Sequence, residues 1–437
     1  MTESYDVVVV GAGLAGACAA ALLARHCGIA PQRIALLDYV VPGKSRAVPD
    51  AGGAPDVPVV PDLQRATDVG GPPAGPPALR VVAISRASQR VLTAAGAWPL
   101  LDQARLCAYE RMRVWQQDAD FDSDAALCFD AADIGEPNLG YIAESGALQA
   151  ACVESFRAAG GTLIGAQLAA VVFDAARARV ECIDGRVIAA RLVVGADGAQ
   201  SLVREAAGIA VRTHDYRQLA IVATVRSARP HQHTAWQRFL HTGPLALLPL
   251  FDGSSSMVWS LDEAEVPALR DGSADEFNQR LETALDGVLG ATQLASERLS
   301  FVLSSVAAHS YIAPRCALIG DAAHVIHPLA GQGANLGLLD AAALCEALAG
   351  AVAQREDPGA MRVLRGYEQQ RRTHNLAMDA AMTALQLGFG AARGPAAWLV
   401  NRGLSLVNRS GAIKRAFARQ ALGTAGELPR LARAAIG

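Results

Sequence analysis

Lysine is nearly absent from this 437-residue chain, where only Lys44 and Lys414 contribute to the 39 lysine and arginine residues. This scarcity argues against a mechanism that needs a buried lysine. The formal net charge is -3, so the basic surplus that nucleic-acid-binding proteins usually carry is missing as well. We therefore expect no nucleic-acid partner.

The chain also lacks a CxxC pair, although it has eight cysteines, several of them in apolar segments. This pattern favours reduced, buried thiols in a cytoplasmic protein. The apolar segment from Tyr5 to Ala24 resembles a membrane span, but no positive charge precedes it and three glycines interrupt it. We expect a strand, a turn and a helix there, and no transmembrane segment.

A glycine-rich turn follows the first expected strand, residues 6–10, whose continuous apolarity is typical of a strand buried on both faces. Gly11 permits a tight turn, Gly13 lets a pyrophosphate approach the backbone, and Gly16 lets the following helix pack on the strand. A second strand, 34–37, ends in Asp38, whose carboxylate can accept hydrogen bonds from ribose hydroxyls. This order predicts a Rossmann-type dinucleotide site, without separating FAD from NAD.

A second turn of this kind lies in the last third of the chain. The apolar strand 316–319 delivers Gly320 and Asp321, and a proline and a glycine-rich turn then open a long apolar helix. The carboxylate can bind sugar hydroxyls, and the helix N-terminus offers amide groups to negative charge. Asp197 also ends a strand and precedes a glycine, but such a junction is common on its own.

The other patterns predict an α/β protein with a discontinuous dinucleotide-binding domain. Strands near 162–173, 179–182 and 187–195 are assigned to its parallel sheet. Short strands at 219–225, 235–240, 245–250 and 257–261 predict an inserted antiparallel sheet that forms the substrate wall. Ser85 is the expected N-cap of one helix, and further helices are expected at 145–158 and 275–289. Nine of the 21 prolines lie in residues 42–79, which predicts an extended, disordered excursion.

The expected division of the chain is as follows. The dinucleotide-binding domain comprises 1–110, 144–215 and 311–383; substrate-side strands occupy 111–143, and the antiparallel substrate domain occupies 216–310. Residues 384–437 form basic amphipathic helices, with eight cations and one acid. They either pack on the protein with a solvated basic face or bind anionic lipid or a partner protein.

In sequence order, the GxGxxG turn, the Asp197-Gly198 pair and the Gly320-Asp321 pair resemble the class A FAD-dependent monooxygenases. Within that group the chain resembles the ubiquinone-biosynthesis hydroxylases, which act on polyprenylated phenols. Specific strings carry this resemblance over nearly the whole chain: 83–85, 140–142, 215–218, 237–239, 243–250, 258–260, 320–337 and 367–372.

The resemblance implies a Rossmann-type FAD-binding domain and a set of FAD-binding positions. Gly11 to Gly16 and Asp38 would hold the AMP half, Asp321 the ribityl chain, and the amides of 331–335 the pyrimidine edge of the flavin. Asp197 would brace the pyrophosphate region and the approach of an NAD(P)H donor. The full set is Gly11, Gly13, Leu14, Ala15, Gly16, Asp38, Arg80, Gln149, Asp197, Gly320, Asp321, Pro328, Gly331, Gln332, Gly333, Ala334 and Asn335.

Two departures from the family pattern affect this assignment. The family has Asn-Arg after the position of Glu144, whereas this chain has Ser145-Gly146 and lacks that arginine contact, which weakens the placement of Gln149. The 42–79 excursion before the strand at 79–84 is also longer than usual in the family.

The resemblance further implies hydroxylation of a polyprenylated phenol or benzoquinol through a flavin C4a-hydroperoxide, in an apolar chamber that excludes water. No residue stands out as an acid–base catalyst. His324 and His327 are three residues apart, but no third ligand is near, so packed histidines are expected instead of a metal site. His309, Tyr311 and Tyr216 are candidate pocket residues.

Three alternatives stay open at this point. A protein of the same fold could hydroxylate a small aromatic compound, reduce a polyprenyl group, or bind a dinucleotide without catalysis. The ring position, C1, C5 or C6, is not readable from the sequence. A lipophilic polyprenyl-phenol substrate favours a peripheral position at the inner membrane face or a place in a multi-enzyme complex.

Overall fold

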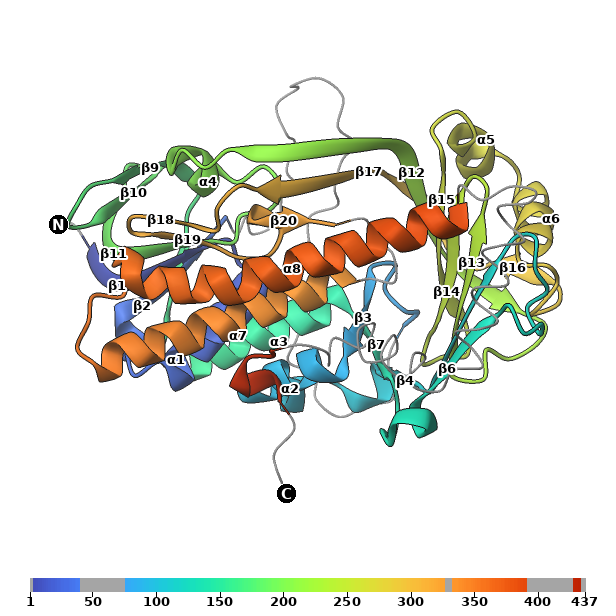
Figure 1. Cartoon of the computed structure of the whole chain (residues 1–437), viewed down its shortest axis with the longest axis horizontal. Coiled ribbons are helices and arrows are strands. Elements are labelled where there is room, and N and C mark those ends of the chain that lie inside the picture. Colours follow the sequence, from blue (N-terminus) through green and yellow to red (C-terminus); the bar gives the residue numbers. More distant parts are fainter. Residues whose placement is uncertain (1–2, 40–74, 327–331, 391–426, 434–437) are drawn as a thin grey trace.

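The computed structural model describes residues 3–39, 75–326, 332–390 and 427–433. Residues 42–74 of the proline-rich excursion and most of 391–437 therefore lie outside the described residues. The described chain forms an elongated molecule, with a parallel sheet and long helices at one end and a second sheet with two short helices at the other (Figure 1).

Five parallel strands form the centre of the first sheet, in the order β19-β11-β1-β2-β8. Their bounds are β1 Glu3–Val10, β2 Ile34–Asp38, β8 Thr162–Gly165, β11 Val187–Gly195 and β19 Cys316–Leu318. β18 (Ile312–Ala313) pairs antiparallel with β19 at one edge. The carboxyl ends of parallel strands share one edge of a sheet, where ligands usually bind. The turns after Val10, Gly195 and Leu318 therefore meet there.

The assignment of residues 162–173 and 179–182 to the parallel sheet is correct only for β8. β9 (Leu168–Phe173) and β10 (Ala178–Cys182) pair antiparallel with each other, and β10 pairs antiparallel with β11. Only residues 174–177 connect β9 to β10, and a parallel crossover needs a dozen residues or more. A hairpin is therefore the arrangement that this short connection allows.

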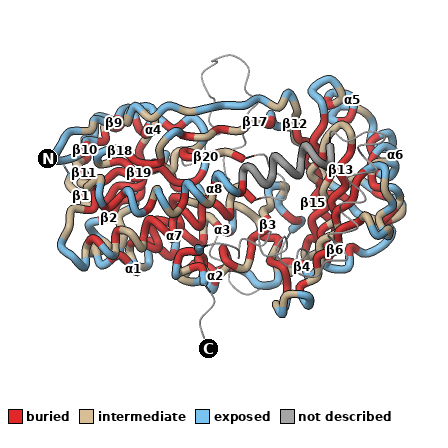
Figure 2. The backbone as a smooth tube through the Cα atoms, in the orientation of Figure 1, coloured by how far each residue is buried: buried red, intermediate tan, exposed pale blue. Residues whose placement is uncertain are grey.

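Three helices pack together on the first sheet: α1 (Leu14–His26), α3 (Ser145–Ala158) and α7 (Gln332–Ala353). Figure 2 shows the buried stretches of α7 and of the strands beside it. Within the described chain, α7 alone is long and apolar enough to cross a membrane, but 67% of its most apolar window is buried in the protein. It is therefore placed as a core helix. α8 (Met361–Gly390) runs beside α7 and reaches the second sheet (Figure 1).

The second sheet has the order β20-β17-β12-β15-β14-β13-β5-β6, with β16 paired to β12. All its pairs are antiparallel except β13 with β5. The four expected short strands are present, but β12 is a 17-residue strand that runs from beside the first sheet into the second (Figure 1). The bounds are β5 Arg111–Gln116, β6 Leu127–Asp130, β12 Val211–Ser227, β13 Thr234–Leu240, β14 Gly243–Pro249, β15 Ser255–Asp262, β16 Thr292–Leu294, β17 Leu299–Ala308 and β20 His324–Val325.

Short helices complete the second sheet. α5 (Val266–Asp271) packs on it through Val266 and Leu269, and α6 (Ala274–Ala284) packs on it through Phe277 and Leu281. The helix expected at 275–289 ends five residues earlier, at Ala284. A capping box between Ser273 and Glu276 fixes the start of α6.

A three-stranded sheet, β3-β7-β4, lies between the other two (Figure 1). Its strands are β3 Val81–Ser85, β4 Cys107–Tyr109 and β7 Gly140–Glu144. Ser85 caps α2 (Arg86–Ala94) as expected, because its Oγ accepts a hydrogen bond from the Ser88 amide. The remaining short elements are α4 (Leu202–Ala206) and the 3-10 helices η1 Pro31–Arg33, η3 Trp98–Leu100, η4 Gln103–Arg105, η5 Ala131–Ile134, η6 Gly320–Ala322 and η8 Arg430–Ala432.

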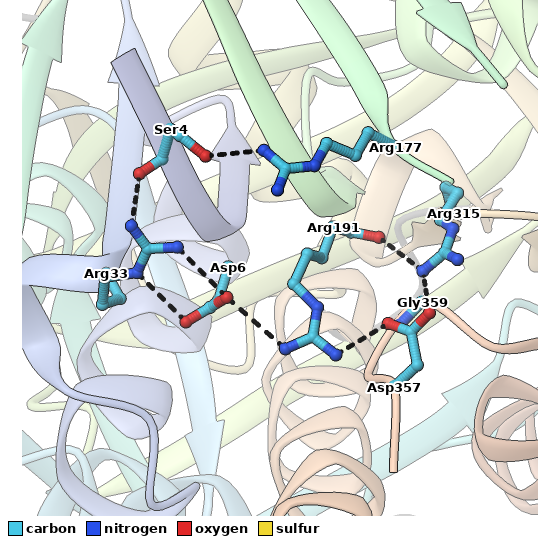
Figure 3. Close-up of polar contacts among 8 residues, drawn as sticks. All are labelled: Ser4, Asp6, Arg33, Arg177, Arg191, Arg315, Asp357 and Gly359. Carbon is cyan, nitrogen blue, oxygen red and sulfur yellow. Dashed lines mark hydrogen bonds and ion pairs between the residues drawn. The ribbon is translucent and has the colours of Figure 1, made fainter. Parts of the chain in front are cut away.

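An ion-pair network ties the first sheet to the connection between α7 and α8. Arg33 and Arg191 both contact Asp6, and Arg191 and Arg315 both contact Asp357 (Figure 3). Most of these side chains are partly exposed, and such pairs each contribute little to stability. The network lies at the end of β1 opposite the glycine turn, so we assign it a structural role.

Candidate cofactor and substrate site

The turn after β1 is shaped by its glycines. Gly11 has φ +99°, and a Cβ added to it would lie 2.3 Å from the Ala196 carbonyl oxygen. A Cβ on Gly16 would lie 1.9 Å from the Gly11 carbonyl oxygen, whereas one on Gly13 would meet nothing within 4 Å. Gly11 and Gly16 therefore allow close packing, and the side of Gly13 is open. No side chain caps α1 and no acid lies in its first turn, so its amide groups can receive an anion.

Asp38, at the end of β2, holds this turn. Its Oδ2 accepts a hydrogen bond from the Ala12 amide at 2.8 Å, and its Oδ1 accepts one from the Tyr39 amide at 2.6 Å. Gln149 of α3 donates from Nε2 to the Ala12 carbonyl at 2.8 Å. The Gln149 side chain therefore stabilises the backbone of the glycine turn at Ala12.

Asp197 follows β11 and is the acid of the second turn. Its Oδ1 accepts from Ser201 Oγ at 2.5 Å, and its Oδ2 accepts from the Val203 amide at 3.1 Å, so it orders the start of α4. Arg204 of α4 donates from Nη1 to the Ala322 carbonyl at 3.0 Å. The second turn is therefore fastened to the third.

The third turn, η6, packs directly on α1. Gly320 has φ +57°, and a Cβ on Gly320 or on Gly337 of α7 would lie 3.0 Å from the Ala15 Cβ. Small residues thus let α1, η6 and α7 meet. The Asp321 side chain reaches solvent although protein surrounds it on most sides. Desolvation raises the pKa of its carboxyl group, and the neighbouring His324 and Arg80 oppose that rise.

The N-terminus of α7 is anchored to β3 by Asn335, whose side chain is 2% exposed. Its Oδ1 accepts from the Ser85 amide at 2.9 Å, and its Nδ2 donates to the Ala83 carbonyl at 2.8 Å. No acid lies in the first turn of α7, which contains Gln332, Gly333 and Ala334. The expected positions Pro328 and Gly331 lie outside the described residues, as does His327.

A cavity of about 650 Å³ lies close to the third turn. β20 forms part of its wall, and this strand begins two residues after the end of η6. Its walls come from β12, β13, β14, β17, β20 and α8. The apolar lining is formed by Phe239, Leu240, Pro244, Val306 and Ile326. About half of the lining residues are polar, and Tyr216 and Tyr311 are among them, whereas His309 is exposed elsewhere. The polar residues are Arg212, Thr213, His214, Tyr216, Gln218, His241, Ser305, Tyr311, His324 and Asn375. A concave chamber that combines apolar walls with several polar side chains is a candidate small-molecule site.

A buried carboxylate that the sequence analysis did not single out joins the third turn to this cavity. Asp340 of α7 accepts hydrogen bonds from the Gly320 amide at 3.1 Å, His324 Nε2 at 2.6 Å and Arg371 Nε at 2.7 Å. Asp340 and Arg371 are both 0% exposed. Desolvation alone would raise the pKa of Asp340, but its interactions with His324 and Arg371 outweigh that effect and lower the pKa strongly. The sequence held one signal for this residue, because an acid within the apolar run 332–353 is expected to be buried and therefore to need a partner.

Together these features fit a dinucleotide. The open side of Gly13 and the free N-terminus of α1 suit a pyrophosphate, and carboxylates at two strand ends suit sugar and ribityl hydroxyls. Among the described residues, no group of three or more histidine, cysteine, aspartate or glutamate side chains is placed to hold a metal ion.

Comparison with known proteins agrees with this arrangement. A family model described as an FAD binding domain matches residues 169–381. The chain is 40% identical over 359 residues to ubiquinone hydroxylase UbiL of Rhodospirillum rubrum, covering 81% of this chain and 82% of that protein. It is 33% identical over 425 residues to 3-demethoxyubiquinol 3-hydroxylase of Escherichia coli K12, covering 96% and 99%.

Among solved structures, p-nitrophenol 4-monooxygenase PnpA of Pseudomonas putida DLL-E4 superposes with a TM-score of 0.72, over 96% of this chain and 99% of that one. At 18% identity this match supports the fold alone. Fold and sequence together define an FAD-dependent monooxygenase. Within that class, the chain belongs to the family of ubiquinone-biosynthesis hydroxylases, so the predicted family, fold class and FAD cofactor are confirmed.

Proposed function

We propose that the chain hydroxylates the aromatic ring of a polyprenylated phenol or benzoquinol intermediate of ubiquinone biosynthesis, with NAD(P)H as the electron donor. The observation that carries this proposal is the cavity whose wall includes residues 324–326, just after the Gly320–Asp321 turn, together with apolar side chains such as Phe239 and Leu240. In a family of ubiquinone hydroxylases, a chamber at this place suits an aromatic ring presented to the flavin. The ring carbon is left open.

Each of the three turns has a role in holding FAD under this proposal. The α1 N-terminus and Gly13 bind the pyrophosphate, and Asp38 binds the adenosine ribose. Asp321 accepts hydrogen bonds from the ribityl chain, with Arg80 close enough to influence its charge. The α7 N-terminus, steadied by Asn335, faces the pyrimidine edge. We propose the same division into domains as expected from the sequence: FAD-binding parts at 1–110, 144–215 and 311–383, and substrate parts at 111–143 and 216–310.

When bound and reduced, FAD supplies the activation of O₂ and the transfer of one oxygen atom to the ring. The residues of the chain bind and orient the cofactor and the substrate, and they exclude water. Phe239, Leu240 and Ile326 exclude water from the chamber, and Asp340 fixes the Gly320 backbone at the junction of the cofactor and substrate regions.

We also propose that the basic segment 384–437 brings the enzyme to an anionic membrane face or to a multi-enzyme complex. A polyprenyl substrate diffuses poorly through water, and a basic amphipathic surface is attracted to anionic lipid. This segment lies mostly outside the described residues, so the proposal rests on its composition.

Quinone-intermediate profiling in a strain deleted for the gene tests the function. We expect one polyprenylated phenol to accumulate, lacking a single ring hydroxyl, and its structure identifies the carbon. Re-expression of the chain should restore ubiquinone, and the purified enzyme should oxidise NADH or NADPH only together with that phenol. An unchanged quinone profile would refute the proposed function. If neither NADH nor NADPH were oxidised in the presence of the phenol, the proposed electron donor would be refuted.

A further inference from the structure

His324 is the most unusual polar residue on the cavity wall. It lines the cavity and is 5% exposed, yet within the described chain its Nδ1 is buried and has no hydrogen-bond partner. A buried polar atom without a partner costs about 1–3 kcal/mol. Because His324 lines the cavity, a ligand bound there can complete the hydrogen bonding of Nδ1 after a local shift of the wall.

The other ring nitrogen of His324 is fixed. Nε2 lies 2.6 Å from Asp340 Oδ2, and Asp340 is held by Arg371 at 2.7 Å and by Asn375 Nδ2 at 3.3 Å. Because the carboxylate can only accept, Nε2 carries the proton of the neutral imidazole. Nδ1 then has a free lone pair, which can accept a hydrogen bond and a proton. A carboxylate that orients a histidine in this way is a recurrent arrangement for a general base.

We propose that His324 is a catalytic residue that accepts the proton of the substrate's phenolic hydroxyl, with Asp340 as its positioning residue. This inference rests on the proposed function. In the step, the phenolic O–H bond breaks, an N–H bond forms at Nδ1, and the electron pair stays on oxygen. The phenolate is more electron-rich, and the ring therefore receives an electrophilic oxygen more readily. No electron is exchanged with the protein.

Charge balance favours this transfer in a buried site. Arg371 already neutralises Asp340, since both are fully buried and hydrogen-bonded to each other. A proton on His324 therefore gains its counter-charge from the new phenolate, and the site stays neutral overall. In the structure Nδ1 is covered by neighbouring atoms, so the contact requires a local adjustment of the wall. Acid–base hydrogen bonds often close only when substrate is bound.

The ionisable groups that face His324 come from several elements. Asp340 lies on α7, Arg371 on α8, Asp321 on η6, and Tyr311 just before β18, with its ring 5.6 Å from that of His324. Burial and the charge of Asp340 raise the pKa of Tyr311 far above neutrality, so it does not ionise in the tested range. Further along the same cavity lie Arg212, His214, Tyr216 and His241.

The direct test measures the ionisation of a bound phenol. The probe is 2-geranyl-4-nitrophenol, a prenylated phenol whose phenolate absorbs visible light, added to the oxidised FAD-loaded enzyme. Its methyl ether serves as the non-ionisable blank. We expect the bound phenol to ionise at least about one pH unit below the free probe, because a nearby opposite charge lowers a pKa by about 1–3 units.

The variants are His324→Gln and His324→Asn, which keep a polar group but cannot take the proton. His309→Gln is the matched control, since His309 is exposed outside the cavity. We expect either His324 variant to lose the shift in phenol ionisation and about 10²-fold in the hydroxylation rate of 2-prenylphenol at neutral pH, with FAD affinity retained. The control should keep both.

Bound phenol that ionises at the same pH as free phenol in the wild type would overturn the assignment, even if every variant failed to fold. Hydroxylation by a FAD-loaded His324→Gln enzyme at the wild-type rate, with an unchanged shift, would overturn it as well and leave the proposed function standing. Absence of hydroxylation of any prenylated phenol by the wild type would instead refute the proposed function, and the role of His324 with it.

Discussion

Alanine at Gly13 and alanine at Gly16 are expected to have opposite effects, although the two positions are three residues apart. Gly13 has φ -56° and ψ 170°, a conformation that alanine adopts without strain, and its Cβ would meet no protein atom within 4 Å. The Cβ of Gly16 would lie 1.9 Å from the Gly11 carbonyl oxygen and 2.9 Å from the Ala196 Cβ.

The magnitudes follow from these contacts. Gly13→Ala should leave the FAD-free protein unchanged or stabilise it by about 0.4–1 kcal/mol. Its methyl group would stand where the pyrophosphate approaches, and a steric cost of about 1–3 kcal/mol weakens FAD binding about 5- to 150-fold. Gly16→Ala pushes into backbone atoms that cannot move freely, so it should destabilise the FAD-free protein by at least about 1–3 kcal/mol. The better helix propensity of alanine, about 1 kcal/mol, offsets part of this loss.

Two measurements separate the effects: urea unfolding of the FAD-free proteins, and titration with FAD followed by flavin fluorescence. We expect Gly13→Ala to fail only in the titration and Gly16→Ala to fail already in the unfolding experiment. If Gly13→Ala bound FAD as tightly as the wild type, the open side of the turn would not be the pyrophosphate path, and the reasoning would be wrong.

Three further predictions concern carboxylates and the basic segment. Asp321→Asn should weaken FAD binding about tenfold while changing stability by less than about 0.5 kcal/mol, because the side chain reaches solvent; an unchanged FAD titration would contradict its role. Asp340→Asn should cost about 3–5 kcal/mol at pH 7, because it leaves Arg371 buried without its counter-charge. Since the folded-state pKa of Asp340 is lowered, its contribution to stability is complete above the ordinary value of 3.8 and is lost as the pH falls below it. The stabilities of the variant and the wild type, measured by urea unfolding, should therefore converge in acid. A difference in stability that stays constant with pH would exclude this role of Asp340. Neutralising Arg409, Lys414, Arg415 and Arg419 should reduce co-sedimentation with anionic liposomes, and undiminished binding would remove the membrane proposal.

The sequence predicts those parts of the fold that depend on local patterns. The strand before Gly11, the end of the second strand at Asp38, the cap at Ser85 and the helix Ser145–Ala158 all follow from neighbouring residues, and the structure has them where they were expected. Glycine spacing also predicts the close packing, because only the absent Cβ atoms of Gly11 and Gly16 allow it.

Features that depend on distant pairing were not readable. The hairpin of β9 and β10 was assigned to the parallel sheet, because strand composition does not give direction. The Asp340–Arg371 pair joins two helices, and although the apolar run around Asp340 marks a buried acid, its partner follows only from the packing of α7 against α8. His324 was correctly expected to be packed and hydrogen-bonded, but the missing partner of its buried Nδ1 and its place on the cavity wall emerge only when β20 pairs with β17.

The central claim is that three turns, far apart in the chain, hold one FAD molecule. Hydrogen–deuterium exchange of the purified chain with and without FAD tests it most directly. FAD should slow exchange together at amides of residues 11–16, 197–203 and 320–322, with half-saturation at the same FAD concentration. Protection of only one of these segments, or of none while FAD is bound, would contradict the claim.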